Sequence, residues 1–485
     1  RFLAVSVDEK KTDDKELKAV LDDLAVTIPF ARDPEQYAGK QFGVQGIPSL
    51  CVLGLNNTIQ VYETGYRPGL DDELVKKIDG LLAGQDVYRD QMTQFEAARE
   101  KYAAWLDKWI EKGVYVASSD DVEVPEAKIL PRTDPKAFVL EPLWKCTDPK
   151  MPGNMIAVSG TGGASRLLVI DSLSSVVEIG AGGKVASMHS LDLPERQAAT
   201  MIRTATGSDG KRFYAVSGLL QQQVYLFDEN WKKVLTFPDD AIKNPHAGIW
   251  DVQLADVNAD GTLELLVGYN GDVGVQCISL EGKRLWSYRS LAMVSRIALW
   301  APDPKGPRYV LCTNELGSLV LIDAQGKAVT DALGRRQEIK IPNRGIYWVL
   351  SADLMGNQSM LLAGLSPPEP GVSIAIGIDP RGAELWNYPV PKGDFPKRAA
   401  HVERIVAGNL APNGPGQWLI PGPDGSIAAI APDGKVVDRW QTGSAIAGLT
   451  TMTIDGQPVL VVAVADAVEA WRLKWPTAEK RPSDR

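Results

Sequence analysis

The sequence of 485 residues predicts a multidomain protein, in which a small mixed α/β domain precedes a large all-β domain. Strand and helix patterns alternate over residues 1–84. Residues 138–475 contain almost no helix pattern and repeat one strand-and-turn unit. Residues 85–137 are expected to form a charged helix and a linker, and residues 476–485 a disordered tail.

The composition fits a globular protein with many short strands joined by turns, because 44% of residues are hydrophobic and the chain holds 45 Gly and 32 Pro. A net charge of -9 argues against nucleic acid or an anionic membrane surface as the main partner. No run of about 18 apolar residues occurs, so the sequence predicts no transmembrane segment.

The first domain is expected to alternate strands and helices. The first helix pattern begins with acidic residues, as helix N-termini favour, and the last helix pattern, which is amphipathic, ends at Gly84. Strands are expected at 2–7, 27–30 and 58–63, and 46–53 is expected to be a turn that leads into a strand. Helices are expected at 14–24, between Phe30 and Phe42, and at 70–82.

Residues 86–112 predict one long charged helix with aromatic residues and Met92 along one flank, including Trp105 and Trp109. We expect this flank to pack on a neighbouring domain or partner. The alternative is that the helix is a solvated spacer. Residues 113–137 show no periodicity and indicate a linker.

The second domain repeats a short apolar strand seven times, at intervals on the order of 40 to 60 residues. An alternating strand with a polar turn follows most copies, and Trp286, Trp386 and Trp440 close three of them. Seven units of this size predict a seven-bladed β-propeller, since radial repetition leaves no long exposed sheet edge. The copies are 156–160, 214–218, 265–268, 309–314, 361–364, 418–422 and 459–463.

The first domain contains the segment Phe42-Gly-Val-Gln-Gly-Ile-Pro-Ser-Leu50, which follows a strand and a helix. The segment is similar to the Val-x-Gly-x-Pro-Thr segment of thioredoxin-like proteins, and residues 1–84 resemble the last two thirds of such a redoxin or TlpA-type domain. The resemblance implies that Pro48 is the cis-proline facing the active-site cysteines.

The Cys-x-x-Cys pair of that family would precede Arg1, so we expect the thioredoxin-like domain to be incomplete here. Cys51 does not match the nucleophile position. The four cysteines are far apart, which excludes a sequence-local zinc site or redox pair, and three of them occur in apolar strand contexts typical of buried residues.

The segment Asp256-Val-Asn-Ala-Asp-Gly-Thr-Leu-Glu264 places oxygen-bearing side chains at alternate positions, as calcium loops do. With the strand that follows, it resembles an FG-GAP/VCBS propeller repeat. The resemblance implies one structural calcium site; a metal-free Asx-rich turn is the alternative. The implied ligands are the side chains of Asp256, Asn258, Asp260 and Glu264 and the carbonyl of Thr262.

The Asp-x-x-Gly-Lys-x-x-Trp turns are similar to those of quinoprotein propellers, but the tryptophans are more simply explained as packing between blades. The sequence carries no PQQ, NAD or haem signal. Polar residues ahead of first strands are candidates for lining the central channel, where they bind a small ligand or peptide end or simply border a wet pore. These candidates are His246, Arg296, Arg344 and His401.

Two functions follow. One is an envelope thiol–disulfide oxidoreductase whose propeller docks a protein or peptide client; it applies only if residues upstream carry Cys-x-x-Cys, since this chain holds no catalytic residue for it. The alternative is a non-enzymatic propeller scaffold with a redox-inactive thioredoxin-like appendage. Calcium-dependent repeats favour a periplasmic, cell-envelope or extracellular location.

Overall fold

The computed structural model divides into two compact units, Arg1–Trp105 and Leu106–Arg485. It shows no helix long and apolar enough to cross a membrane within the residues that it describes. These are residues 3–6, 13–23, 26–34, 37, 44, 48–54, 58–65, 70–89, 93, 97, 100, 125–159, 165–195, 197–239, 245–301, 308–331, 334, 336–369, 372–395, 402–412 and 414–476.

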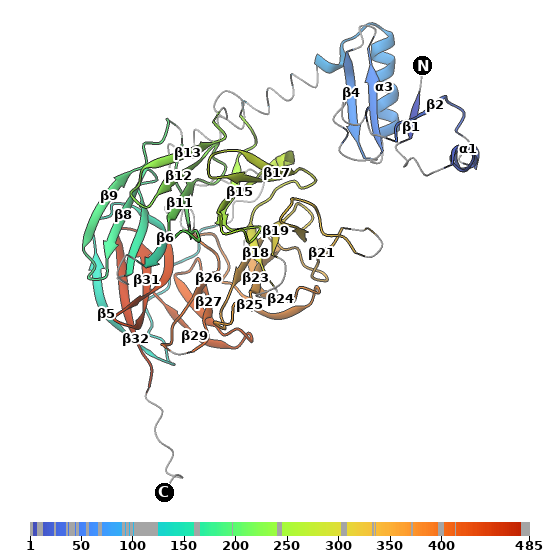
Figure 1. Cartoon of the computed structure of the whole chain (residues 1–485). Coiled ribbons are helices and arrows are strands. Elements are labelled where there is room, and N and C mark those ends of the chain that lie inside the picture. Colours follow the sequence, from blue (N-terminus) through green and yellow to red (C-terminus); the bar gives the residue numbers. More distant parts are fainter. Residues whose placement is uncertain are drawn as a thin grey trace. The chain divides into compact units, whose positions relative to one another are not determined.

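The N-terminal unit has the α/β order that the sequence predicts. Strands β1 and β2 pair in parallel with α1 between them in sequence, and β3 and β4 form an antiparallel pair that α3 follows (Figure 1). The expected helix before Phe42 and most of residues 86–112 lie outside the described residues. The elements are β1 (Ala4–Ser6), α1 (Asp14–Asp23), β2 (Phe30–Arg32), β3 (Ser49–Leu53), β4 (Ile59–Thr64) and α3 (Leu70–Leu82).

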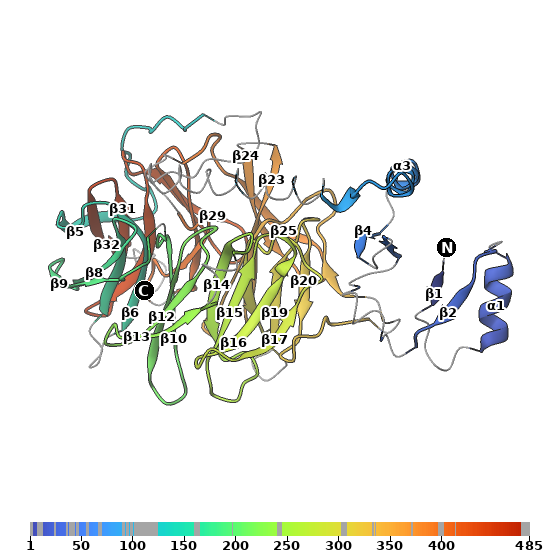
Figure 2. The same cartoon turned by 90° about the horizontal axis from the view of Figure 1, so that it is seen from above.

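The second unit is a seven-bladed β-propeller. Seven antiparallel four-stranded sheets, the blades, follow one another around a ring (Figure 1), and the first strands of neighbouring sheets lie side by side, as β10 and β14 do (Figure 2). First strands are therefore innermost. Blades 1 to 3 are β6 (Pro152–Ser159), β7 (Ser165–Asp171), β8 (Ser175–Gly180), β9 (Val185–Ser190); β10 (Met201–Thr206), β11 (Arg212–Ser217), β12 (Val224–Asp228), β13 (Lys233–Phe237); and β14 (Ile249–Ala255), β15 (Glu264–Tyr269), β16 (Val275–Ser279), β17 (Arg284–Tyr288).

The last blade closes the ring with a strand from the other end of the domain. Strand β5 (Val139–Cys146) pairs antiparallel with β32 and forms the outer edge of blade 7. Blades 4 to 7 are β18 (Ile297–Trp300), β19 (Tyr309–Thr313), β20 (Leu319–Ile322), β21 (Glu338–Ile339); β22 (Trp348–Ala352), β23 (Leu361–Glu369), β24 (Val372–Ile378), β25 (Glu384–Pro389); β26 (Val406–Gly408), β27 (Gln417–Pro421), β28 (Ser426–Ile430), β29 (Val436–Gln441); and β30 (Gly448–Ile454), β31 (Gln457–Val464), β32 (Ala467–Lys474) with β5.

Six of the seven predicted sequence copies are second strands of blades 2 to 7. The first copy, residues 156–160, instead overlaps the innermost strand β6 of blade 1. Strand β7 is equally apolar, and its core residues Leu167 and Leu168 are fully buried. Apolar runs mark buried strands without giving their order within a blade, which explains the shift.

The hydrophobic core lies between the blades. Seven clusters of buried side chains fill the seven interfaces, one for each neighbouring pair of blades, including the pair formed by blades 7 and 1. Because each sheet buries both faces against its neighbours, no single blade has a complete core.

Tryptophans of outer strands bind the next blade, which is the packing role that the sequence predicts. Trp286 of β17 donates its indole N–H to the Ala324 carbonyl in blade 4, at 3.0 Å. Trp144 of β5 donates to Ala181 in blade 1, at 2.9 Å. A Cβ on Gly326 would lie 2.5 Å from the Trp286 ring, so only glycine lets this turn approach so closely.

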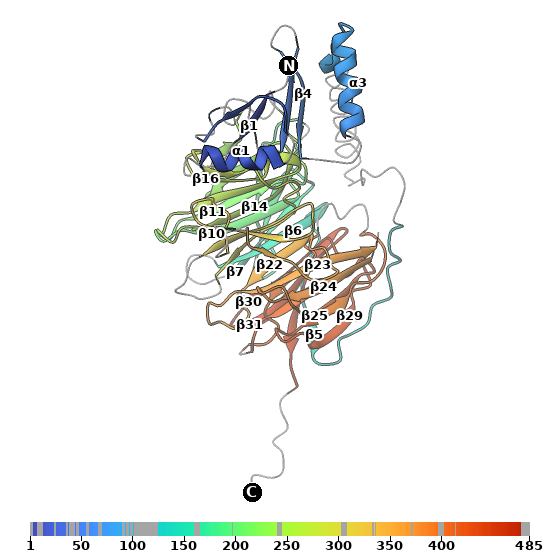
Figure 3. The ribbon, with the colours of Figure 1, turned by 90° about the vertical axis from the view of Figure 1, so that its right-hand side faces the viewer.

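Residues 125–137, which we call the strap, differ from the predicted linker. They form backbone bridges to the propeller at Asp394 and Gln441 before the chain enters β5, as the teal segment in Figure 3 shows. The amides of Lys136 and Ala137 both donate to Asp438, at 2.6 Å. These contacts, and not helix or strand periodicity, order the strap, so the sequence pattern could not reveal it.

Candidate functional site

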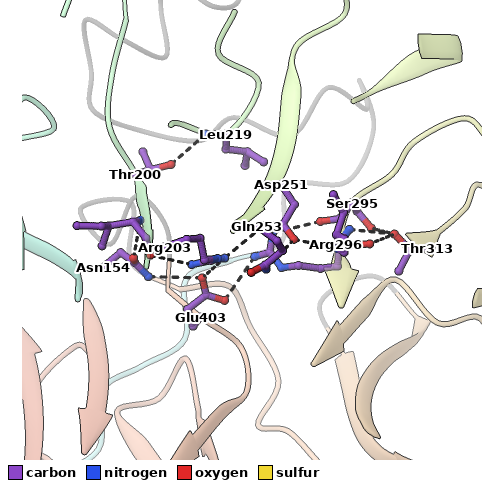
Figure 4. Close-up of polar contacts among 12 residues, drawn as sticks. Asn154, Thr200, Arg203, Leu219, Asp251, Gln253, Ser295, Arg296, Thr313 and Glu403 are labelled. Atoms are coloured by element: carbon purple, nitrogen blue, oxygen red, sulfur yellow. Dashed lines mark hydrogen bonds and ion pairs between the residues drawn. The ribbon is translucent and has the colours of Figure 1, made fainter. Parts of the chain in front are cut away.

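Five polar residues from five blades meet at the innermost strands, and we call them the axial cluster (Figure 4). Each stands in, or close before, the first strand of its blade. The cluster consists of Asn154 (β6), Arg203 (β10), Asp251 (β14), Arg296 (before β18) and Glu403 (before β26).

The two arginines of the axial cluster lie between the two carboxylates. Arg203 Nη2 lies 2.7 Å from Glu403 Oε1 and 3.3 Å from Asp251 Oδ1. Arg296 reaches the same two carboxylates at 3.7 Å through its two terminal nitrogens. Asn154 Nδ2 adds a 3.5 Å hydrogen bond to Glu403. Two positive and two negative charges thus form a neutral group.

Burial makes these charges depend on one another. Asp251 is fully buried, and its Oδ2 accepts the Ile297 amide at 2.9 Å. Burial alone lowers the pKa of Arg203, but the ion pairs with Glu403 and Asp251 outweigh it and raise the pKa. For Arg296 burial dominates over the same two carboxylates, and its pKa is lowered. Removing one partner would leave a buried charge uncompensated, at a cost of about 3–5 kcal/mol.

The axial cluster also reaches blade 5, because the Arg296 guanidinium lies 3.2 Å above the ring of Trp348 on β22. The backbone amide of Arg296 donates to Thr313 Oγ1 of β19, at 2.9 Å. Six of the seven blades therefore share one electrostatic hub. Its groups are two guanidiniums, two carboxylates and one amide, which pair with one another across the blades.

The predicted channel residues fall in different places. Arg296 belongs to the axial cluster, whereas Arg344 forms an ion pair with Glu384 on the fourth strand of blade 5, away from the innermost strands. His246 precedes β14, and its Nε2 lies 2.9 Å from the Gln222 carbonyl. His401 lies outside the described residues.

The other members of the axial cluster were missed by sequence reasoning. The available signal was a single charged residue within an apolar first strand, as Arg203 in Met-Ile-Arg and Asp251 in Ile-Trp-Asp. That signal becomes readable only when the first strands of the blades are aligned. Glu403 stands in a loop, where charged residues are common, so its sequence position carries no such mark.

The predicted calcium loop connects β14 and β15. Asp256 accepts the amides of Asp260 and Gly261, at 3.1 and 3.0 Å. Asp260 accepts the amide of Thr262 at 2.7 Å, and Asn258 Oδ1 accepts the amide of Asp260 at 2.9 Å. The loop oxygens thus cap the loop's own backbone, as in an Asx-rich turn.

Two further contacts involve the carboxylates of this loop. Buried Glu264 accepts the Val257 amide at 2.8 Å, and burial raises its pKa more than that hydrogen bond lowers it. The Arg308 guanidinium lies 3.6 Å from Asp256. Within the described part of the chain, no group of three or more His, Cys, Asp or Glu side chains is placed to hold a metal ion. The predicted ligand set also includes Asn258 and the carbonyl of Thr262, and the calcium site remains a prediction.

The structure describes only part of the segment that resembles thioredoxin-like proteins. Pro48 immediately precedes β3, and its carbonyl accepts the Gly65 amide at 2.7 Å; Ile47 lies outside the described residues. All four cysteines are free thiols, and burial raises the pKa of each, to about 12 for Cys277. A raised pKa leaves little thiolate at neutral pH, so these cysteines lack the property that thiol–disulfide exchange requires.

Comparison with known proteins gives distant structural similarities. No protein-family model and no curated protein matches the sequence. Two crystal structures of BBS1N in complex with ARL6DN, soaked with mercury or with lead, show 13% identity and TM-scores of 0.49 and 0.48. They cover 71% and 70% of this chain, and 99% and 98% of theirs. Chaetomium thermophilum Raptor shows 11% identity and a TM-score of 0.48 over 71% of this chain and 30% of its own. The class of protein, a seven-bladed β-propeller, rests on the sheet topology itself.

Proposed function

We propose that the chain is a non-enzymatic binding protein whose propeller docks a protein partner. The observation that carries this proposal is a group of three exposed apolar residues on loops that are hydrogen-bonded together, which we call the apolar patch. They are Met293, Leu316 and Tyr347, which are 41%, 71% and 42% exposed. Exposed apolar residues grouped on loops are typical of protein-binding surfaces.

The three residues of the apolar patch come from loops that are hydrogen-bonded together on one face of blades 4 and 5. The Ala292 amide donates to Glu315 at 3.1 Å, which joins the loop before β18 to the turn between β19 and β20. Ser295 Oγ donates to the Tyr347 carbonyl at 2.7 Å, which joins the first loop to the one before β22. The apolar patch is therefore a preformed surface.

The chemistry of the apolar patch indicates the kind of partner. Met293 has a φ of 56°, a conformation that costs a non-glycine residue free energy, yet it exposes its apolar side chain there. The exposed carboxylate residue Glu315 directly precedes Leu316. The partner is accordingly a protein segment that combines apolar side chains with a lysine or arginine.

The test selects peptides from a displayed random library on the purified chain and measures their binding by calorimetry. Selected peptides should combine apolar and basic residues, and Leu316→Asp should weaken them about tenfold or more. Leu385→Asp is the matched control, since Leu385 is 56% exposed on the fourth strand of blade 5. Failure to enrich such peptides, or equal losses in both variants, would contradict the proposal.

The oxidoreductase hypothesis remains a prediction about a longer protein, because it depends on a Cys-x-x-Cys pair that this sequence does not contain. The family assignments, the calcium site and the envelope or extracellular location likewise remain predictions. The parallel β1–β2 pair and the β3–β4 pair followed by α3 support the thioredoxin-like assignment in element order. Insulin reduction by a parent that carries the pair, lost on Cys→Ser substitution, would favour the enzyme.

A further inference from the structure

A cavity lies between blades 6 and 7, at the place where the strap crosses them. The cavity is open to solvent, and its empty volume of about 320 Å³ includes the solvent at its mouth. Its walls are largely apolar and include Trp440, Leu460, Val462 and Trp471. Its polar lining consists of Arg132 of the strap, Gln441, Thr442, and Glu469, whose carboxylate is ion-paired with Lys145 at 3.0 Å. A concave apolar site with a few polar groups is the usual form of a small-molecule site.

The lining of this cavity includes a buried, unsatisfied hydrogen-bond acceptor. Gln441 is 9% exposed, and its Oε1 has no hydrogen-bond partner among the described residues. Its Nε2 donates to the Asp424 carboxylate at 3.3 Å, and its backbone amide donates to Thr133 Oγ1 at 3.0 Å. Flipping the side-chain amide of Gln441 would place its oxygen against the Asp424 carboxylate, which is unfavourable because both groups are acceptors. Gln441 Nε2 therefore faces Asp424, and Gln441 Oε1 points away from it. A buried acceptor without a donor costs about 1–3 kcal/mol, which a ligand donor would recover.

A second polar group in the lining of the cavity is the positively charged guanidinium of Arg132. The Arg132 guanidinium lies 4.0 Å above the Trp471 ring, and 43% of its side chain is exposed. Its nearest described carboxylate is Asp134, at 3.7 Å and largely in solvent. A stacked, partly exposed guanidinium retains N–H donors that can bind a carboxylate.

We propose that this cavity binds a small aromatic carboxylate that carries a hydrogen-bond donor at its other end. The ring would pack against the apolar wall, the donor would reach Gln441 Oε1, and the carboxylate would face Arg132. The proposed protein docking on blades 4 and 5 plays no part in this site, so either proposal can fail without the other.

The probe is 4-hydroxyphenylacetate, titrated into the full chain and followed by ligand-observed NMR and calorimetry. Phenylacetate lacks the donor and should bind about fivefold more weakly, the effect of one hydrogen bond. Arg132→Ala should weaken 4-hydroxyphenylacetate about fivefold or more. Arg381→Ala is the matched control, because Arg381 is 90% exposed on a turn of blade 5, and should leave binding unchanged.

Gln441→Leu supplies a second variant, in which the preference for 4-hydroxyphenylacetate over phenylacetate should disappear. If that variant does not fold, the Arg132→Ala and phenylacetate comparisons still decide the matter. Absence of binding at millimolar probe, equal affinities for the two probes, or equal losses in the two arginine variants would overturn the proposal.

Discussion

The two units of the chain differ in how completely their described residues bury apolar surface. In the propeller, seven clusters fill the seven blade interfaces. In the N-terminal unit, the only buried hydrophobic residues among those described are Leu17 and Val61, whereas Leu3, Val75 and Leu82 are each more than half exposed. The propeller carries its own core, while the described N-terminal elements leave much of their apolar surface uncovered.

This difference indicates which unit carries the stability of the chain. Hydrophobic burial is the dominant favourable contribution to folding, so the propeller should fold on its own and the N-terminal unit should contribute little to its stability. The strap and β5 belong energetically to the propeller, although they precede blade 1 in sequence.

The largest expected effect of a point substitution comes from the axial cluster. Asp251→Ala should lower the free energy of unfolding by about 3–5 kcal/mol, because it leaves buried Arg203 and Arg296 without one shared carboxylate. Denaturant unfolding measures this. Asp433→Ala, which removes an exposed ion pair with Lys435, should produce no measurable change. Equal effects would show that the axial cluster does not hold the blades together.

An intermediate effect is expected where a tryptophan binds the next blade. Gly326 and Gly210 both have φ of +79°, but only at Gly326 would an added Cβ meet a ring, that of Trp286. Gly326→Ala should therefore destabilise by about 1–3 kcal/mol more than Gly210→Ala. Thermal unfolding of both variants makes the comparison, and equal losses would mean that the backbone conformation alone requires glycine.

A smaller, pH-dependent effect is expected at Glu264. Because its folded pKa is raised, stability is present below the unfolded pKa of about 4.3 and is lost as pH rises through the folded pKa. Glu264→Gln removes that loss, so in chelator its stability relative to the wild type should increase as pH rises from about 4 to 7.

Calcium separates the two interpretations of the same loop. If calcium binds the Asp256–Glu264 loop, the metal should raise the wild-type Tm, and Glu264→Gln and Asp260→Ala should remove the increase. An unchanged wild-type Tm on chelation would establish the loop as an Asx-rich turn that needs no metal.

Sequence periodicity was sufficient to predict the repeated strands of the propeller and the order of the described N-terminal elements, because local apolar patterns determine both. The blade count is confirmed by the sheet topology. Long-range pairing was not accessible: β5 pairs with β32 more than 300 residues later, at Cys146 and Val468. The strap was taken for a linker for the same reason, since its order comes from contacts with distant residues.

The axial cluster could be predicted from the sequence even less completely than the fold. Of the predicted channel residues, Arg296 lies in the axial cluster, and its position before a first strand was the informative feature. Its partners Asp251 and Glu403 come from blades 3 and 6, so only the closed ring brings them together. The apolar patch is likewise built from three loops that are separate in sequence.

The most direct test of the account is calorimetry of shortened chains, since its central claim is that the strap, β5 and the seven blades form one self-sufficient unit. A chain of residues 125–485 should keep the propeller transition of the full chain within about 2 °C, whereas a chain of residues 147–485, which lacks β5, should lose it. A large fall in Tm for 125–485, or an unchanged transition for 147–485, would contradict the claim.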